Sequence, residues 1–522
     1  MAEILLTWAE SKPDQMALAD EYSQITWGEF NSNVNKLIQS LRDAGLETGD
    51  TFSVLSGNRN EYYEILSAAA NGGWSYVPIN WHFTAEEVAY VIENSDSKAF
   101  IADSRFAEVA SDTVARDEVN DLKAKIIIGK QGKTPDGFIL YDDFISDASD
   151  SEPDDQSLGG PMFYTSGTTG RPKGVKSSSF QAGGSLEILR MIGEGTTQMM
   201  QMPPEGITLL AGPLYHSAQW AFSFLPMVAG SAVVMRHKFN PEETLDLIDK
   251  YKITNTHMVP TQFVRLLRLD DEIKNSFKGS SLKLCWHGAA PCPHEIKRKM
   301  IEWWGPIIFE YYGSTEGSII TACTSDEWLE RPGTLGKPLP IIEPHIIKED
   351  GTKAGPNEHG QLYFKNLMGS SFEYHKEPDK TKEAYLEPGV STFGDIGYLD
   401  EDGYLFMSDR KIDMIISGGV NIYPAEIEDI LSNHPAISDC AIFGVPNEEW
   451  GEEVKAAVEL KKDYTASDEL TQELIAFTAK HLAKYKAPKS IDYLEEMPRT
   501  VTGKLLKRKL RDKYWEKSGR TI

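Results

Sequence analysis

The sequence predicts an α/β protein with a large N-terminal domain, made of two α/β subdomains and a β-rich subdomain, and a small α+β C-terminal domain. Three observations support this prediction. The chain has 522 residues, more than a single hydrophobic core usually covers. In two long stretches, short apolar strand patterns alternate with amphipathic helix patterns, which is typical of parallel sheets. Between the second stretch and the C-terminal region, short strands joined by Gly and Asp turns replace that alternation.

The first α/β stretch covers residues 4–103. Residues 51–55 and 74–79 have the apolar pattern of short buried strands, and a helical pattern lies between them. Thr84 precedes another helical pattern, and Glu87 stands three positions after it, as in a capping box. We expect parallel pairing, because strands joined by helices of this length enter a sheet in the same direction.

The second α/β stretch covers residues 207–317. Its predicted strands are residues 207–212, 232–235, 255–259, 283–287 and 307–312. Helices are expected from Pro241 and from Thr261. Small or polar residues follow the strands, so a ligand site is expected where the strands end.

A block of predicted antiparallel strands follows, at residues 360–365, 392–398 and 403–406. A charged segment comes next, and a strand-helix pattern then continues to the end of the chain. The expected domains are therefore residues 1–410 and 411–522, because the second range is long enough for a core of its own.

Residues 164–174 read YTSGTTGRPKG and have the composition of a phosphate-binding loop. Glycine lets backbone N–H groups turn toward an anion, and the hydroxyls and two cations supply further donors. The stretch is not the P-loop of nucleotide hydrolases, because Gly170 is not followed by Lys and Ser or Thr. Pro172 argues against a helix directly after the loop. A flexible polar loop without a ligand is the plainer alternative.

Three further patterns indicate a ligand site only because they follow predicted strands. His216 stands in an aromatic and small-residue cluster, although a single histidine is more often a packed residue than a catalyst. Small residues at 288–290 would let a flat ligand lie against the backbone, although a tight turn explains them equally well. Glu316 would suit Mg²⁺ beside bound phosphates, although an isolated turn carboxylate is usually only solvated.

Composition excludes several classes of function. The chain carries 79 acidic and 53 basic residues, a formal charge of −26, which disfavours binding to nucleic acid or anionic membrane. No apolar run reaches the length of a membrane-spanning helix, so we expect no integral membrane segment and a cytoplasmic location. The four cysteines lack metal-site spacing, and we expect buried free thiols.

Taken together, the motifs closely resemble the adenylate-forming superfamily, of the acyl-CoA synthetase or fatty-acid–CoA ligase type. The motifs that carry the resemblance are YTSGTTGRPKG, YYGSTEG, TFGDIGY, SDRKIDMIISGGVNIYPAEIE and PRTVTGKLLK. Their order and combination are far more specific than any one of them, and they cover nearly the whole chain. The resemblance implies that the C-terminal domain is a mobile lid.

The resemblance also implies roles for matching residues. The ATP and AMP site would comprise Thr165, Ser166, Gly167, Thr168, Thr169, Gly170, Lys173, Gly288, Ala289, Ala290, Tyr312, Gly313, Thr315, Asp395 and Arg410. Residues implied in catalysis are Lys504, His216, Thr165 and Glu316, of which Thr165 and Glu316 would lie near Mg²⁺. The acyl pocket would include His216, Trp220 and Gly313.

The implied reaction has two halves. A carboxylate attacks the α-phosphorus of Mg·ATP to give acyl-AMP and pyrophosphate, and a thiol then displaces AMP. For coenzyme A, the resemblance implies contacts from Ser417, Gly418, Gly419, Trp450 and Tyr485. The lid would turn about Ile412, where the superfamily usually has Asp or Lys, and Ala487 stands where some relatives carry Arg for the CoA phosphates.

The acid is the least determined part of the prediction. The residues around His216 favour a medium- or long-chain fatty acid or a bulky apolar acid, whereas a short acid of the methylthio-propionate type follows if Trp220, Phe222 and Phe224 fill the pocket. A third alternative is an enzyme that loads a carrier protein, and a luciferase-like or non-catalytic protein has less support. A homodimer is compatible with the sequence.

Overall fold

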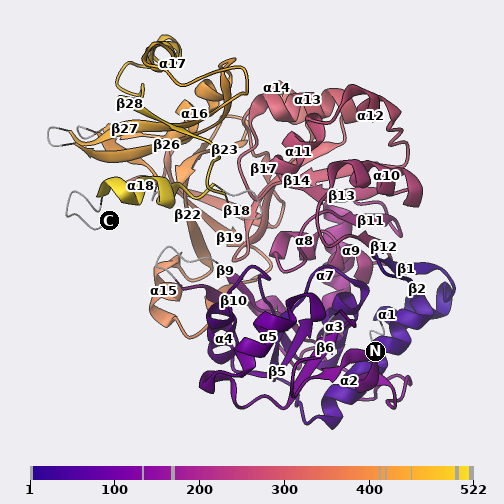
Figure 1. Cartoon of the computed structure of the whole chain (residues 1–522). Helices are drawn as coiled ribbons and strands as arrows, with labels where there is room; N and C mark the ends of the chain where they lie inside the picture. Colours follow the sequence, from indigo (N-terminus) through magenta and orange to yellow (C-terminus); the bar gives the residue numbers. More distant parts are fainter. Residues whose placement is uncertain are drawn as a thin grey trace.

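The computed structural model describes residues 4–131, 134–165, 171–410, 413–417, 420–447, 450–499 and 505–515, and Figure 1 shows their arrangement. Several residues named above lie outside the described residues: Ser166, Gly167, Thr168, Thr169, Gly170, Ile412, Gly418, Gly419 and Lys504. Among the described residues, no helix combines the length and the hydropathy that crossing a bilayer requires.

The first subdomain is built on a six-stranded parallel sheet. In spatial order its strands are β7 (Ile139–Leu140), β6 (Ala124–Ile128), β5 (Ser97–Asp103), β3 (Thr51–Leu55), β4 (Ser75–Pro78) and β8 (Gly160–Pro161). The main helices are α2 (Trp27–Asp43), α3 (Asn60–Gly72), α4 (Ala85–Asn94) and α5 (Ala107–Val114). Thr84 and Glu87 form the predicted capping box of α4, and β3 pairs with β4 and β5 in parallel. The predictions for this part of the chain are confirmed.

The second subdomain contains a nine-stranded sheet. Its order is β17 (Lys337–Pro338), β16 (Ser318–Cys323), β15 (Ile308–Ser314), β14 (Leu284–His287), β13 (Asn255–Met258), β11 (Ile207–Leu210), β12 (Ala232–Met235), β1 (Met16–Ala19) and β2 (Gln24–Thr26). The helices along this part of the chain are α7 (Leu186–Met199), α8 (Ser217–Ala221), α9 (Phe224–Val228), α10 (Pro241–Tyr251), α11 (Pro260–Leu267), α12 (Asp271–Ser276), α13 (His294–Trp304) and α14 (Ser325–Glu330).

One strand pairing departs from the order of the sequence. β1 pairs in parallel with β12, with Leu18 opposite Val233, so the N-terminal segment completes the second sheet and not the first. Helix α1 (Ile4–Ser11) packs on α2 of the first subdomain. The N-terminal segment therefore joins the two subdomains.

Two antiparallel sheets make up the β-rich part. The larger has β18 (Ile342–Ile347), β19 (Gly360–Asn366), β22 (Val390–Leu399), β21 (Tyr385–Glu387) and β23 (Leu405–Arg410). The smaller has β20 (Phe372–Tyr374), β10 (Lys173–Ser177) and β9 (Phe163–Thr165), so it combines strands from distant parts of the chain. The expected antiparallel block is present, and α15 (Pro378–Glu383) lies between β20 and β21 in the chain.

The C-terminal part forms the α+β unit that the sequence predicts. Its strands are β25 (Val420–Ile422), β24 (Ile415–Ser417), β27 (Gly451–Leu460), β26 (Ile437–Asn447) and β28 (Ser490–Leu494), and its helices are α16 (Pro424–Ser432), α17 (Asp468–His481) and α18 (Lys507–Trp515). A separate apolar core includes Leu431, Ile442 and Val458. Figure 1 shows these orange and yellow elements as a lobe of their own.

Candidate active site

The predicted phosphate loop connects two antiparallel strands. Thr165 at the end of β9 lies opposite Lys173 at the start of β10, so the two residues flank the loop at its base. A strand follows Pro172, as expected from a proline that disfavours a helix there. The hairpin therefore places Thr165, which carries a hydroxyl, opposite Lys173, which carries an ammonium. The loop residues between them, 166–170, lie outside the described residues.

Tyr374 links the loop to the turn that carries Glu316. The Lys173 ammonium lies 5.2 Å from the centre of the Tyr374 ring, and the Tyr374 hydroxyl donates to Glu316 Oε1 at 3.1 Å. Burial lowers the pKa of Lys173, and the charge of Lys380 lowers it further. Tyr374 was not identified from the sequence, because it reaches the site only through the pairing of β20 with β10.

The donors around Glu316 fit Mg²⁺ held mainly by substrate. Within the described ranges, no group of three or more His, Cys, Asp or Glu side chains is arranged to hold a metal ion by itself. Mg²⁺ typically takes one or two protein ligands together with phosphate oxygens and waters, so the Thr165 hydroxyl and the Glu316 carboxylate are a suitable donor set.

The carboxyl ends of β14 and β15 form a close-packed wall. A Cβ atom on Gly288 would lie 2.5 Å from Cε1 of the Tyr311 ring, so glycine is required for the two strands to approach. Ala289 follows with a φ of 64°, a conformation that non-glycine residues rarely adopt. Strained backbone of this kind is common at ligand sites.

Tyr312 and Asp395 meet beside this wall. The Tyr312 hydroxyl donates to Asp395 Oδ2 at 2.5 Å, and both side chains are buried. Asp395 in β22 lies opposite Arg410 in β23. Residues from three predicted motifs therefore come together from β15, β22 and β23, although they are far apart in sequence.

His216 directly precedes α8, at the N-cap position, and its side chain makes no capping hydrogen bond. Burial lowers the pKa of His216 to about 4, so its imidazole is neutral at physiological pH. The next residue, Ser217, forms a hydrogen bond between its Oγ and Thr315 Oγ1 at 2.8 Å. The first turn of α8 is thus fixed against the turn that follows β15, which brings His216 to the side of the same site.

Trp220 and Phe222 point to different surroundings. The Trp220 ring packs among Phe163, Phe180 and Phe224 at centroid distances of 5.5 to 5.8 Å. Phe222 instead stacks on His257, on the other side of α8. The sequence treated these aromatics as one pocket, whereas the structure packs them into separate clusters.

A buried ion pair supports the wall from behind. Lys297 Nζ of α13 lies 2.5 Å from Glu310 Oε2 of β15, and His287 Nε2 of β14 lies 3.6 Å from the same oxygen. Lys297 and His287 are fully buried. Burial and the charge of Lys297 hold the pKa of His287 well below its usual range. The sequence did not single out these residues.

Trp450 and Tyr485, two of the predicted CoA residues, lie on exposed surface of the C-terminal lobe. Ser417 is partly exposed and pairs across β24 and β27 with Gly451, the residue that follows Trp450 in the chain. Trp450 is 53% exposed and Tyr485 is 50% exposed. Both aromatics are available to a planar ligand, and Trp450 is not a packing residue of the core.

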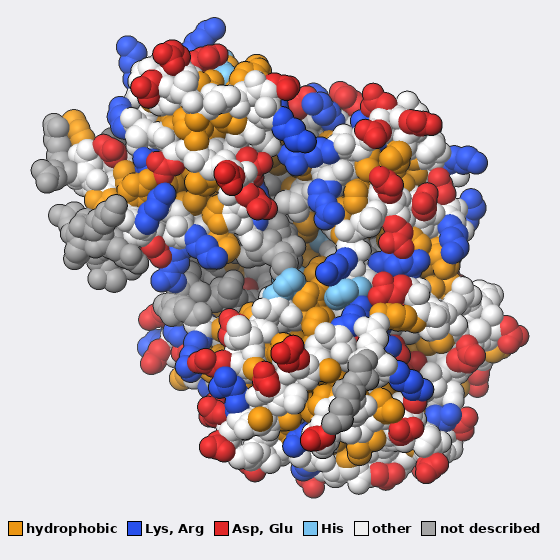
Figure 2. Space-filling view, in the orientation of Figure 1, with side chains coloured by type: hydrophobic (Ala, Val, Ile, Leu, Met, Phe, Trp, Pro, Cys, Tyr) orange, Lys and Arg blue, Asp and Glu red, His pale blue; other side chains and the backbone are white. Residues whose placement is uncertain are grey.

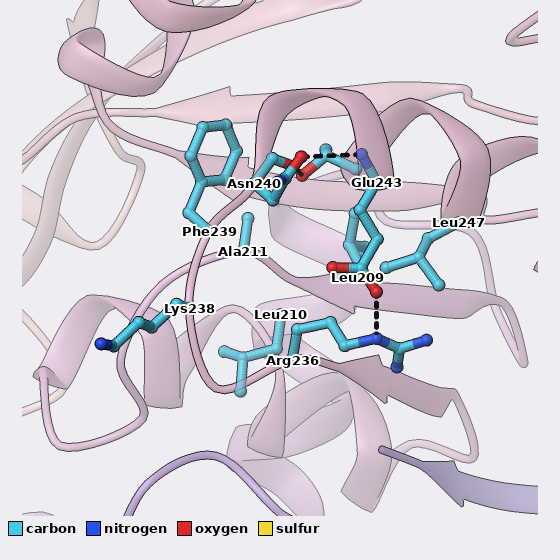
Figure 3. Close-up of a pocket in the computed structure, with 10 residues that line it drawn as sticks. Leu209, Leu210, Ala211, Arg236, Lys238, Phe239, Asn240, Glu243 and Leu247 are labelled. Atoms are coloured by element: carbon cyan, nitrogen blue, oxygen red, sulfur yellow. Dashed lines mark hydrogen bonds and ion pairs between the residues drawn. The ribbon is translucent and has the colours of Figure 1, made fainter. Parts of the chain in front are cut away.

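Two small cavities lie in the N-terminal part of the chain. One is lined by Glu316, Phe364 and Phe393, between the Glu316 turn and the β-rich sheet. The other, shown in Figure 3, contains Lys238 and an ion pair of 2.6 Å between Arg236 and Glu243 at the end of β12. Figure 2 shows acidic and basic side chains interspersed over one face, with histidines beside its central hollow.

The described cysteines are free thiols, as predicted. Cys285, Cys323 and Cys440 are buried, whereas Cys292 is only half-buried, so the expectation of burial was wrong for that residue. Cys292 follows the turn at Ala289 and precedes α13, where the chain runs along the surface of the subdomain.

Two family models identify this two-lobed α/β protein as an adenylate-forming enzyme. The model for "AMP-binding enzyme" matches residues 5–369, and that for "AMP-binding enzyme C-terminal domain" matches residues 426–504. The chain belongs to the AMP-binding enzyme family and is an AMP-forming ligase.

Relatives of known function cover nearly the whole chain. It is 30% identical to a 2-succinylbenzoate–CoA ligase of Bacillus velezensis, over 97% of each chain. It is 31% identical to a long-chain-fatty-acid–CoA ligase of Bacillus subtilis, over 99% of this chain and 95% of the relative. ATP-bound MatB from Rhodopseudomonas palustris is structurally similar, with 26% identity, coverage of 98% and 99%, and a TM-score of 0.83.

Proposed function

We propose that this protein activates a carboxylic acid with Mg·ATP as an acyl-adenylate and transfers the acyl group to coenzyme A. The observation that carries the proposal is the contact of Lys173 and Glu316 with Tyr374, together with the contact of Tyr312 with Asp395, around the end of β15. ATP, Mg²⁺ and coenzyme A are the co-substrates of this reaction.

In the first half-reaction, the protein positions ATP and neutralises its charge. Gly288 and Tyr312 flank the adenine, and Asp395 accepts from the ribose hydroxyls, a role that suits a carboxylate, which only accepts hydrogen bonds. Lys173 and the loop hold the β- and γ-phosphates, and Thr165 and Glu316 would hold Mg²⁺, which would neutralise phosphate charge there. Such positioning and charge stabilisation supply most of the catalysis in phosphoryl chemistry.

The remaining groups act on the acid and the α-phosphate. Thr315 contacts the α-phosphate, and its hydrogen bond to Ser217 ties this contact to the acyl side of the site. His216 is neutral, so it lines the pocket without adding a charge beside the carboxylate. Lys504 bridges the substrate carboxylate and the phosphate, where negative charge is concentrated.

In the second half-reaction, the lid turns about Ile412 and the segment at Ser417 faces the acyl-adenylate. The exposed rings of Trp450 and Tyr485 stack on the adenine of coenzyme A. Ile412 has a β-branched side chain where Asp or Lys is usual, so we expect Ile412→Asp to change thioester formation more than adenylation.

The names of relatives leave the acid and the acceptor thiol open. They include a fatty acid–[acyl-carrier-protein] ligase of Streptomyces coeruleorubidus, 29% identical, and a feruloyl-CoA synthase of a Streptomyces species, 30% identical. A carrier protein is therefore the second candidate acceptor. The exposed Trp450, which precedes the Gly451 that pairs with Ser417, favours coenzyme A, because an exposed aromatic ring can stack on adenine.

The decisive experiment measures AMP release from ATP for a panel of carboxylic acids, with and without coenzyme A. We expect CoA-dependent release with at least one acid, and release that depends on a carrier protein alone would instead support the second candidate. Lys504→Ala should reduce adenylation by orders of magnitude and leave thioester formation from supplied acyl-AMP largely intact. Equal loss of both half-reactions would contradict the lid mechanism.

A further inference from the structure

We infer that His294 and Asp429 form a latch that holds the C-terminal lobe against the large domain in the orientation of this structure. The lobe must release this latch to turn between the two half-reactions. The inference rests on the proposed function, because the two half-reactions require that movement. It gives a role to a pair of side chains outside the assigned nucleotide and coenzyme A residues.

Polar contacts join the second subdomain to the lobe, on the side where α13 and α14 face it in Figure 1. His294 Nδ1, at the start of α13, lies 3.4 Å from Asp429 Oδ1 of α16. The Arg268 guanidinium, at the end of α11, donates to Ser438 Oγ of β26 at 3.1 Å. The helices and strand that carry these residues belong to two separate apolar cores. Both contacts therefore cross between the parts that the mechanism requires to move.

A contact between aromatic rings lies close to the proposed hinge. The His359 ring stacks on Tyr423 of the lobe, with centroids 5.4 Å apart and an interplanar angle of 11°. His359 Nδ1 is also hydrogen-bonded to Ser408 Oγ at 2.7 Å, four residues before Ile412. Helix α16 begins directly after Tyr423 and carries Asp429 about 9 Å farther along its axis. A turn of the lobe therefore moves Asp429 away from His294, which stays with the large domain.

The pair can hold the lobe without fixing it permanently. The side chains of His294 and Asp429 are 37% and 35% exposed, so water competes for both. Polar interfaces of this kind are typical of domains that move relative to each other. The His294 ring is positioned on its own side, because it meets the buried Trp328 edge-on at 5.5 Å. The large domain therefore presents a fixed partner that the lobe can leave and meet again.

The latch shares a helix with the wall of the nucleotide site. His294 stands six residues after Gly288 in the chain, and Lys297, in the same first turn of α13, pairs with Glu310 of β15. Arg268, by contrast, stands twenty residues before Gly288. Of the two polar contacts, that of His294 is therefore the one next to the site, and it is the one to test.

A change in the strength of the latch should change the share of time that the lobe spends in each orientation. The half-reaction that uses this orientation then changes in rate relative to the other one. A merely structural role would lower both rates alike. The ratio of the two half-reaction rates therefore reports on the latch.

The test measures pyrophosphate release from ATP and thioester formation from supplied acyl-AMP. His294→Arg places a permanent cation opposite Asp429, and His294→Asp places a second carboxylate there. We expect the ratio of the two rates to differ by about threefold or more between these variants, with the wild-type value in between. A difference of less than about twofold between the folded variants would overturn the inference.

A background without the Asp429 charge shows whether the effect belongs to the pair. In Asp429→Asn, the two substitutions at position 294 should no longer change the ratio, because the partner is neutral. Glu295→Arg is the matched control, since it makes the same change of charge one residue along, where Glu295 pairs with Lys299 of its own helix at 3.3 Å. An effect that persists in Asp429→Asn, or one of equal size in Glu295→Arg, would overturn the inference.

Two measurements complete the experiment. Thermal melting shows that each variant is folded, and His294→Gln replaces His294→Asp if that variant is not. CoA-dependent AMP release by the wild-type enzyme is measured separately. Its absence with every acid of the panel would refute the proposed function itself, whereas an unchanged ratio in an active enzyme would overturn only the latch.

Discussion

Replacing Lys297 by Met should strongly destabilise the protein, because it leaves the Glu310 carboxylate buried without its cation. The two charged atoms lie 2.5 Å apart, and Lys297 is fully enclosed. Breaking a buried pair of this kind typically costs about 3 to 5 kcal/mol, against a total of about 5 to 15 kcal/mol for a folded domain. The free energy of unfolding from urea titration measures this change.

The consequence for activity follows from where the pair lies. Glu310 stands two residues before Tyr312 in β15, and His287 directly precedes Gly288, so the pair holds both strands of the wall. We expect Lys297→Met to lower AMP release in parallel with the loss of stability.

The double variant Lys297→Met/Glu310→Gln separates the charge from the packing. It removes the unpaired carboxylate, so it should recover at least about 1 kcal/mol relative to Lys297→Met. A single variant that loses less than about 1 kcal/mol, or a double variant less stable than the single, would refute the reasoning.

Three further predictions concern other sites. Tyr312→Phe removes the hydrogen bond to Asp395 and should raise KM for ATP about tenfold in a pyrophosphate-release assay, and an unchanged KM would contradict the assigned role. Burial raises the pKa of Glu64 from 4.5 to about 7. The contribution of Glu64 to stability is therefore present below pH 4.5 and is lost as the pH rises through 7, so Glu64→Gln should stabilise the protein at pH 8 by about 1 to 3 kcal/mol. The same change at the exposed Glu86 should not stabilise it. Trp450→Ala should raise KM for coenzyme A about tenfold without changing adenylation, and an equal effect on both would show a structural role.

Local patterns were sufficient for most strands and for several site positions. β11, β12 and β14 begin or end within a residue or two of the predicted ranges, because buried parallel strands are short apolar runs. Gly288 and Tyr312 follow or close such strands, so the strand prediction also placed them at one edge of a sheet. Gly288 lies against Tyr311, the neighbour of Tyr312, because β14 and β15 pair in parallel, as the alternation of strands and helices predicts.

Contacts that depend on pairing between strands far apart in the sequence could not be predicted. Tyr374 reaches Glu316 because β20 pairs with β10, and β1 pairs with β12, neither of which is visible in a local pattern. Lys297 lies in a helix rich in charged residues, where a lysine is normally solvated. Only the tertiary structure shows which charge of that helix faces inward to Glu310.

The aromatics of α8 show why position around a helix matters more than proximity in sequence. Residues two positions apart, such as Trp220 and Phe222, are separated by about 160° around a helix, so they point to nearly opposite sides of it. The structure accordingly packs Trp220 on Phe224 and Phe222 on His257. Two aromatics that read as one wall in the sequence therefore belong to two separate clusters in the structure.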